Sequence, residues 1–513
     1  MTTSANADIR QGVDPQLVER ERFLQQQLNI RAQAQIKLFS ANHTEEQAAV
    51  IAKEIEALTS QLQGVETEIR QTSPRYAALT QPQPLTLPEI QKQVLDADTV
   101  LLEYSLGTDH SYLWVVTQTS ITSYELPKQV EIETAARAFY TFARTPPPKV
   151  TKPGVAEELQ RQSQSQAAQV AAQLSRLLIA PAASLIGKKR LLIVADGALQ
   201  YVPFAALPVP TTNASGAPGL PLIIEHEIVN LPSASTLAVL RREMGEHQPA
   251  SKTLAVLADP VFERTDERIT ARTVSVETAN TTPKAQTNNA APDAQTTETR
   301  GLGLFVVKSA KESGVADDGV RIPRLPGTRR EAEALVKLVP AAQRKEALDF
   351  AASRQTATSP DLSQYRFVHF ATHGFLNSQH PELSGIALSM VDEKGNPQDG
   401  FLRLHDVFNL KLPAELVVLS ACQTGLGKEI KGEGLVGLTR GFMYAGAPRV
   451  VVSLWSVSDV GTAELMTRFY SGMLKDKLRP AAALRAAQVS MIDDKRFASP
   501  FFWAAFTLQG EWQ

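Results

Sequence analysis

The chain has 513 residues, 43% of them hydrophobic, and its 52 basic and 54 acidic residues leave a formal charge of −2. This length exceeds the usual size of one core, so we expect two or three structural units. The near-neutral balance gives no reason to expect nucleic-acid binding, and no apolar run is long enough to span a membrane. The single cysteine, Cys422, argues against a disulfide-built secreted domain. Because the first residues also lack a signal-peptide pattern, we expect a soluble, cytoplasmic protein.

Residues 1–73 are expected to form an N-terminal helical hairpin with a coiled-coil-like pattern. Leucines 17, 24 and 28 indicate its first helix. Apolar residues at alternating steps of four and three indicate the second, namely Ile51, Ile55, Leu58, Leu62, Val65 and Ile69. Thr44-Glu-Glu-Gln47 reads as a capping box that opens this helix. The hairpin either packs on the rest of the chain or binds a regulatory protein.

Residues 74–262 are predicted to form the N-terminal part of an α/β domain. A Gly107-Thr-Asp-His110 turn between two apolar, β-branched runs indicates a strand hairpin. A long helical pattern follows over residues 154–179. Further buried strands are expected at 191–195, 228–231 and 254–258, and Asp259-Pro260 closes the last of them.

The composition of residues 263–323 shifts towards Thr, Ala, Asn, Gln and Asp, which predicts a low-complexity, disordered surface insertion. Its arginines are hypothetical cleavage points for maturation, if the protein is a protease that prefers arginine. These are Arg264, Arg268, Arg272 and Arg300.

Residues 324–513 are predicted to form the catalytic α/β part, opening with a helix whose N-cap is Thr328. Two short apolar runs, at 367–372 and 416–421, are typical of strands buried on both faces of a parallel sheet. His373 leaves the first strand and Cys422 the second. Since ligands bind outside the carboxyl ends of such strands, both residues would point into one crevice. Strands alternating with helices predict a mostly parallel sheet with helices on both faces.

A lone cysteine and a histidine from another part of the chain are candidates for a nucleophile and its base. The alternative is a buried, unreactive cysteine. Gly425 and Gly427 follow Cys422 and allow a sharp turn. Gly374 follows His373 and leaves a backbone N–H free to approach a substrate carbonyl. His369 lies within the apolar run, so we interpret it as structural.

The chain resembles the CHAT family, caspase-like domains related to caspases and separase and often found beside TPR repeats. The resemblance spans about residues 74–513, and six motifs carry it: Phe370-Ala-Thr-His373-Gly374, Leu419-Ser-Ala-Cys422-Gln-Thr-Gly425, Gly432-Glu-Gly-Leu-Val-Gly437, Ala445-Gly-Ala-Pro448, Ser453-Leu-Trp-Ser-Val-Ser-Asp459 and Ser499-Pro-Phe-Phe-Trp503-Ala-Ala-Phe506. It implies a caspase-like fold and a cysteine endopeptidase working through a Cys422–His373 dyad.

In that mechanism the N–H groups of Gly374 and Cys422 would form the oxyanion hole. Asp459 resembles the acidic residue that receives arginine in the first specificity pocket of separase-like enzymes, which implies cleavage after a basic residue of a protein or peptide substrate. The alternative is that Asp459 caps a helix starting near Thr462.

Other site patterns in the sequence are weaker. Gly432-Glu-Gly434-Leu-Val-Gly437 fits the dinucleotide pattern but lies ten residues past its strand. His380, Glu382 and His405 lack zinc spacing, so no metal or cofactor is expected. Three hypotheses remain: an endopeptidase held latent until a partner or signal arranges the site, a catalytically silent scaffold, and an acyl transferase using the same cysteine.

Overall fold

The structure is a computed structural model that describes residues 13–39, 44–73, 83–147, 155–210, 219–244, 250–269, 322–375, 384–422, 433–455 and 457–512. Most of the predicted insertion, residues 270–321, lies outside these ranges.

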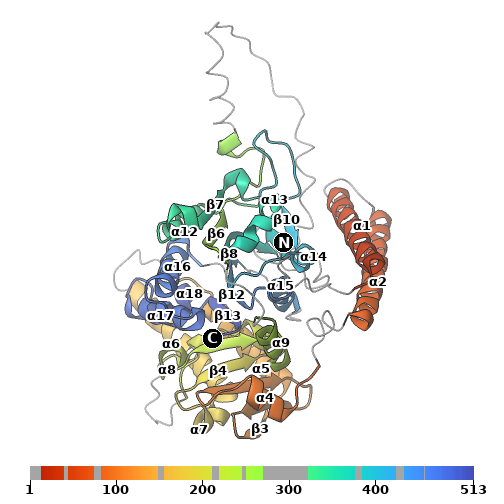
Figure 1. Cartoon of the computed structure of the whole chain (residues 1–513). Helices are drawn as coiled ribbons and strands as arrows, with labels where there is room; N and C mark the ends of the chain where they lie inside the picture. The colour runs from red at the N-terminus through yellow and green to blue at the C-terminus, as the bar shows by residue number, and fades with distance from the viewer. Residues whose placement is uncertain are drawn as a thin grey trace.

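One 13-stranded sheet runs through the body of the molecule (Figure 1). Its main path is, in spatial order, β10 (Phe401–Arg403), β9 (Gly385–Ala387), β8 (Tyr365–Phe375), β11 (Leu416–Cys422), β12 (Arg449–Ser453), β13 (Phe506–Gly510), β5 (Ile228–Leu231), β4 (Arg190–Val194), β1 (Thr99–Ser105), β2 (Ser111–Val116) and β3 (Ile121–Leu126). Off this path, β6 (Lys252–Ala258) pairs with both β7 (Arg344–Leu348) and β8. Seven strand pairs are parallel and five are antiparallel, so the predicted mostly parallel sheet is confirmed. One antiparallel pair, β12–β13, lies in the middle of the sheet, and the other four lie towards its two ends.

Helices cover both faces of this sheet, as the alternating pattern predicts. In β8 the ring of Phe367 contacts Tyr470 of α16 (Asp459–Leu474), while Phe370 contacts Phe442 of α15 (Glu433–Tyr444). Successive strand residues point to opposite faces, so α16 and α15 lie on opposite sides. The other α-helices described in the α/β part are α4 (Leu87–Gln93), α5 (Gln129–Ala143), α6 (Val155–Leu178), α7 (Ala183–Ile186), α8 (Leu222–Glu225), α9 (Ala234–Met244), α12 (Pro326–Val336), α13 (Arg354–Ala357), α14 (Leu404–Phe408), α17 (Pro480–Asp493) and α18 (Pro500–Trp503).

The N-terminal hairpin is present as α1 (Pro15–Phe39) and α2 (Glu45–Thr72), which lie side by side along one flank of the body (Figure 1). The capping box is confirmed: Gln47 N donates to Thr44 Oγ1 at 3.2 Å, and Thr44 N donates to Gln47 Oε1 at 3.1 Å. The predicted stripe of α2 is buried against α1 and reaches Val239 and Tyr444 of the body. The hairpin therefore packs on the α/β part.

Two predicted helix starts are wrong. α12 begins at Pro326 with Leu325 as N-cap. Proline is favoured at the first helical position because an N–H at that position has no hydrogen-bond partner within the helix. Thr328 instead donates its hydroxyl to Leu325 O at 2.7 Å and accepts from Asp259 N at 3.1 Å. α16 begins at Asp459, ahead of Thr462, with the Ser458 hydroxyl accepting from Gly461 N.

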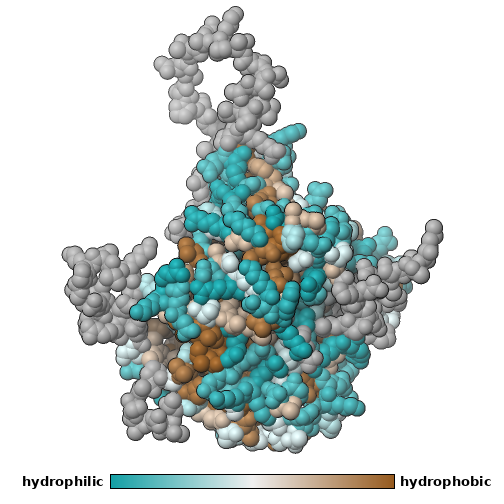
Figure 2. Space-filling view, turned by 60° about the vertical axis from the view of Figure 1, so that its left-hand side comes forward, coloured by the Kyte–Doolittle hydropathy of each residue, from teal (hydrophilic) through white to brown (hydrophobic). Residues whose placement is uncertain are grey.

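Figure 2 brings the side of α12, α16 and α17 forward and shows a mostly hydrophilic surface with separate hydrophobic patches. Among the described helices, none alone is long and apolar enough to cross a membrane. The end of α6 and the segment Ala180–Ile186 pass such a test only as a pair bent by 52°.

Candidate functional site

His373 and Cys422 stand opposite each other in adjacent parallel strands. The β8–β11 ladder runs from Phe367↔Leu416 to His373↔Cys422, which is its last pair. Neighbouring strands lie about 4.8 Å apart, so the two backbones are adjacent at this point. The structure thus brings together the two residues that the sequence singled out.

The strands end differently from the prediction. β8 continues past His373 to Phe375, and Cys422 is the last residue of β11 and does not follow it. β6 pairs with β8 only as far as Ala371, and from His373 onward β9 takes over that edge. β8 therefore stays in the sheet because it changes partner at the level of the candidate site.

Gly374 lies inside β8 and pairs with Ile386 of β9. The ladder to β11 stops one residue earlier, at His373. On its β11 side, Gly374 thus has no strand partner within the described ranges. Gly425 and Gly427 lie outside those ranges.

His373 is buried in an apolar cluster. Only 2% of the residue is exposed, and its ring centroid lies 5.4 Å from that of Phe262 and 6.3 Å from that of Phe375. Burial lowers the pKa of His373 to about 4, although the carbonyl of Pro323 acts in the opposite direction. The imidazole is therefore neutral at pH 7.

One hydrogen bond of the His373 ring defines its tautomer. Nε2 of His373 lies 2.7 Å from the carbonyl oxygen of Pro323. Since a carbonyl only accepts, Nε2 carries the proton and Nδ1 holds the lone pair. Nδ1 is buried and has no hydrogen-bond partner in the described part of the chain. This nitrogen is the one free to act as a base.

The segment that contacts His373 is anchored by an ion pair. Arg324, next to Pro323, donates from Nε to Asp259 Oδ1 at 2.9 Å and from Nη2 to Oδ2 at 2.8 Å. Asp259 is fully buried and directly follows β6. Such bidentate pairs fix geometry as well as charge. Residues 322–325 are thereby held across the carboxyl end of the sheet, against the candidate base.

The same carboxylate joins a larger network. Arg329 Nε donates to Asp259 Oδ2 at 2.7 Å and its Nη2 binds Asp349. Arg268 Nη1 donates to Asp349 Oδ1 and to the backbone oxygen of Asp259, both at 2.7 Å. Burial would lower the pKa of Arg268, but its carboxylate partners outweigh this and raise it. Arg268 is thus a structural ion-pair residue and a poor cleavage point, whereas Arg264 is exposed and Arg272 and Arg300 lie outside the described ranges.

His369 belongs to a different, fully buried network that holds the two strands to their helices. Its Nε2 lies 3.0 Å from Glu331 Oε1 of α12, and its Nδ1 lies 3.2 Å from the hydroxyl of Tyr470 of α16. Ser420 of β11 donates to the other oxygen of Glu331 at 3.1 Å. Burial, and then the charge of Glu331, raise the pKa of Tyr470 well above its usual value. His369 therefore ties β8 to its helices and lies away from the Pro323 contact.

Asp459 is exposed at the first turn of α16. Its side chain lies against Gly327 of α12, so a Cβ added at Gly327 would come within 2.0 Å of the Asp459 Cγ. The carboxylate is therefore at the surface, and not buried as the pocket hypothesis expects. The start of a helix is nonetheless a favourable place for a negative charge.

Metal binding finds no support in the described ranges, where no three His, Cys, Asp or Glu side chains are grouped to hold an ion. His405 is buried beside Asp406, and its Nε2 lies 3.4 Å from Asp406 Oδ1. His380, Glu382 and Gly432 lie outside the described ranges.

Comparison with known proteins finds one sequence relative, two distant structural neighbours and one family. It is 32% identical over 178 residues to tetratricopeptide repeat protein 28 of Homo sapiens, and equally to that of Mus musculus; the match covers 29% of this chain and 7% of those proteins. Saccharomyces cerevisiae separase, solved with securin, superposes with a TM-score of 0.46 at 9% identity, covering 87% of this chain and 31% of that one. The Arg-specific cysteine proteinase gingipain R gives a TM-score of 0.35 at 10% identity, covering 75% and 74%. The CHAT domain profile matches residues 168–511, which is most of the chain. This protein therefore belongs to the CHAT domain family.

Proposed function

We propose that the chain is a cysteine endopeptidase in which Cys422 is the nucleophile and His373 the acid–base. The observation that supports this is the strand register, which sets the two residues opposite each other at the carboxyl end of a parallel sheet. Cys422 is the only cysteine of the chain, so no internal disulfide competes for its thiol. A cytoplasmic, reducing compartment would keep that thiol free.

The reaction needs one proton acceptor and one proton donor. Nδ1 of His373 takes the proton of the Cys422 thiol, and the thiolate sulfur bonds to the substrate carbonyl carbon. The N–H groups of Gly374 and Cys422 stabilise the oxyanion, each by about 3 kcal/mol. The imidazolium then returns the proton to the amide nitrogen as the C–N bond breaks. Water hydrolyses the resulting thioester.

The resting site is poorly suited to this chemistry, which supports a latent enzyme. A pKa of about 4 for His373 disfavours the imidazolium that the reaction must form. The Pro323 carbonyl also occupies Nε2, and Arg324 holds that segment on the buried Asp259. We infer that a partner or signal displaces residues 322–325, which admits water and substrate to His373.

A thiol-reactive peptide probe that ends in arginine tests this proposal, with intact mass as the readout. Purified protein should be labelled, Cys422→Ala should not, and His373→Ala should be labelled more slowly. Arg324→Ala removes the anchor on Asp259, so its labelling should exceed that of the wild type. Faster labelling by an arginine probe than by an aspartate probe, lost in Asp459→Asn, would support Asp459 as the base of the specificity pocket.

The competing hypothesis is a silent scaffold, and one observation favours it. Phe23 and Ile30 of α1 and Val50 of α2 are large apolar side chains with about half of their surface exposed, as a partner-binding hairpin requires. Absence of labelling in both the wild type and Arg324→Ala, together with cellular phenotypes that survive Cys422→Ala, would favour the scaffold. A regulatory protein bound through α1 and α2 is compatible with either function.

A further inference from the structure

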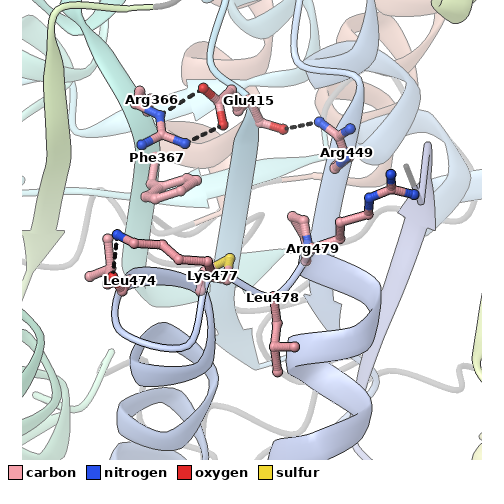
Figure 3. Close-up of a pocket in the computed structure, with 10 residues that line it drawn as sticks. Arg366, Phe367, Glu415, Arg449, Leu474, Lys477, Leu478 and Arg479 are labelled. Carbon is pink, nitrogen blue, oxygen red and sulfur yellow. Dashed lines mark hydrogen bonds and ion pairs between the residues drawn. The ribbon is translucent and has the colours of Figure 1, made fainter.

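A cavity of about 270 Å³ lies at the amino ends of the strands that carry His373 and Cys422 (Figure 3). Its floor comes from Arg366 and Phe367 of β8, from Glu415 before β11, and from Arg449 of β12. Its rim is the turn between α16 and α17, contributed by Met473, Leu474, Lys477, Leu478, Arg479 and Pro480. Arg366 lies seven residues before His373 in β8, and an extended strand rises about 3.3 Å per residue, so the cavity is about 23 Å from the candidate active site. It is therefore a separate feature of the molecule.

The lining carries an excess of positive charge. Its one carboxylate, Glu415, is already paired with Arg366, which donates to both oxygens at 2.7 and 2.9 Å. Arg449 is buried and donates to the backbone oxygen of Glu415 at 3.2 Å. Burial lowers the pKa of Arg449; Glu511 and Glu415 oppose this, while the positive charge of Arg479 adds to it. The two guanidinium groups thus repel each other across the cavity.

The rim departs from two local rules of helix and turn structure. Arg479 is the N-cap of the 14-residue helix α17, yet no side chain caps the first turn. This position favours Ser, Thr, Asp or Asn, and a cation there opposes the positive end of the helix dipole. Lys477 has φ of +58°, a left-handed conformation that is strained for a lysine. Unfavourable local choices that persist together are typical of functional sites.

We propose that this cavity is a docking site for an acidic peptide segment of a partner protein. One Asp or Glu carboxylate of the peptide lies between Arg449 and Arg479, at the uncapped start of α17, where it relieves their repulsion. A neighbouring apolar side chain packs on Phe367, Met473 and Leu478. Lys477, Leu478 and Arg479 are exposed, and the volume is at the small end for ligand pockets. The cavity is therefore an open notch that fits side chains of a longer chain better than a small molecule that must be enclosed.

Fluorescence anisotropy with full-length protein tests the site. The probes are labelled hexapeptides that place one or two Asp or Glu residues among Leu and Phe, each matched by the Asn or Gln peptide of the same sequence. We expect acidic members to bind at least tenfold more tightly than their amide counterparts, with affinity that falls as salt rises. Inorganic phosphate at the same concentration should not compete appreciably, because it makes no apolar contact.

Arg479→Asp is the decisive variant, because it should separate binding from stability. An aspartate caps α17, so the unfolding midpoint should rise while affinity for the acidic peptides falls at least tenfold. Lys188→Asp, an exposed lysine outside the cavity, changes the net charge equally and should leave binding intact. The proposal is overturned if no acidic peptide outbinds its amide partner, if Arg479→Asp binds as well as the wild type, or if phosphate alone competes fully. None of these outcomes depends on peptidase activity.

Discussion

At His373, protonation and folding are coupled. The unfolded histidine has a pKa near 6.5, whereas burial lowers it to about 4 in the fold. Between these values the unfolded chain binds the extra proton, so stability falls as pH drops from about 6.5 towards 4. The neutral imidazole that keeps the candidate base available at pH 7 is thus also a source of acid sensitivity.

His373→Gln should remove this sensitivity. Denaturant unfolding at pH 7 and pH 5 is expected to show that the wild type loses about 2 kcal/mol more than the variant, from the size of the pKa difference. Other titrating groups cancel in the comparison because both proteins contain them. Equal losses in wild type and His373→Gln would contradict the burial of this ring.

At the residue scale, sequence reasoning found what local position reveals. His373 and Cys422 could be predicted because polar residues near the carboxyl ends of buried parallel strands gather at one edge of a sheet. Asp259 obeys the same rule, but its partners Arg324 and Arg329 follow 65 and 70 residues later, beyond an insertion. Nothing local to Arg324 indicates that it fastens Pro323 against His373. Long-range ion pairs of this kind appear only with the fold.

At the element scale, α12 and α16 pack against each other on the same face of β8, and their contact depends on one glycine. A Cβ added at Gly327 would come within 2.1 Å of the Cβ of Asp459, which is close to the backbone of α16. The sequence predicted both helices but set their starts about three residues late, because local capping rules favoured Thr328 and Asp459 as N-caps. Proline at the first position of α12 and the Ser458 cap were the stronger determinants.

Gly327→Ala should push these helices apart and destabilise the fold by about 1–3 kcal/mol, because an overpacked contact near two backbones cannot relax by side-chain rotation. Gly64→Ala is the matched control. It lies inside α2 with nothing within 4 Å of the added methyl group. It should therefore stabilise its helix by about 0.5–1 kcal/mol. Denaturant midpoints of the two variants that shift in the same direction would contradict this account.

At the scale of the whole molecule, the two predicted α/β parts share one sheet. β6, which the sequence groups with residues 74–262, pairs with β7 and β8 of residues 324–513. The last strand, β13, returns to pair with β5 of the N-terminal part. The alternating strand and helix patterns predicted the class of fold, but they carry no information on which strand lies beside which. Strand order follows from packing across the whole chain, so it could not be predicted from local patterns.

By strand order, the sheet has two parts, β1–β5 and β6–β13, and one contact between them lies at the C-terminal end of the described chain. β13 and β5 share the single pair Gln509↔Asn230. Glu511, which is 1% exposed, accepts from Arg241 of α9 at 2.5 and 3.3 Å. Trp512 is buried, with the guanidinium of Arg241 4.2 Å and that of Arg190 5.3 Å from its ring centroid. A tryptophan between two arginines thus links β6–β13 to β1–β5.

Trp512→Ala should therefore uncouple the two parts as well as weaken them. Loss of a buried tryptophan costs about 3–5 kcal/mol, and here the loss falls on a joint with little strand pairing to replace it. Calorimetry should show one unfolding transition for the wild type and two for the variant, since parts that no longer stabilise each other melt separately. Trp114→Ala, in β2 near the far edge of the sheet, is the control: it should lower the midpoint and keep one transition. A single transition in Trp512→Ala would mean that the sheet itself, and not the C-terminal joint, couples the two parts.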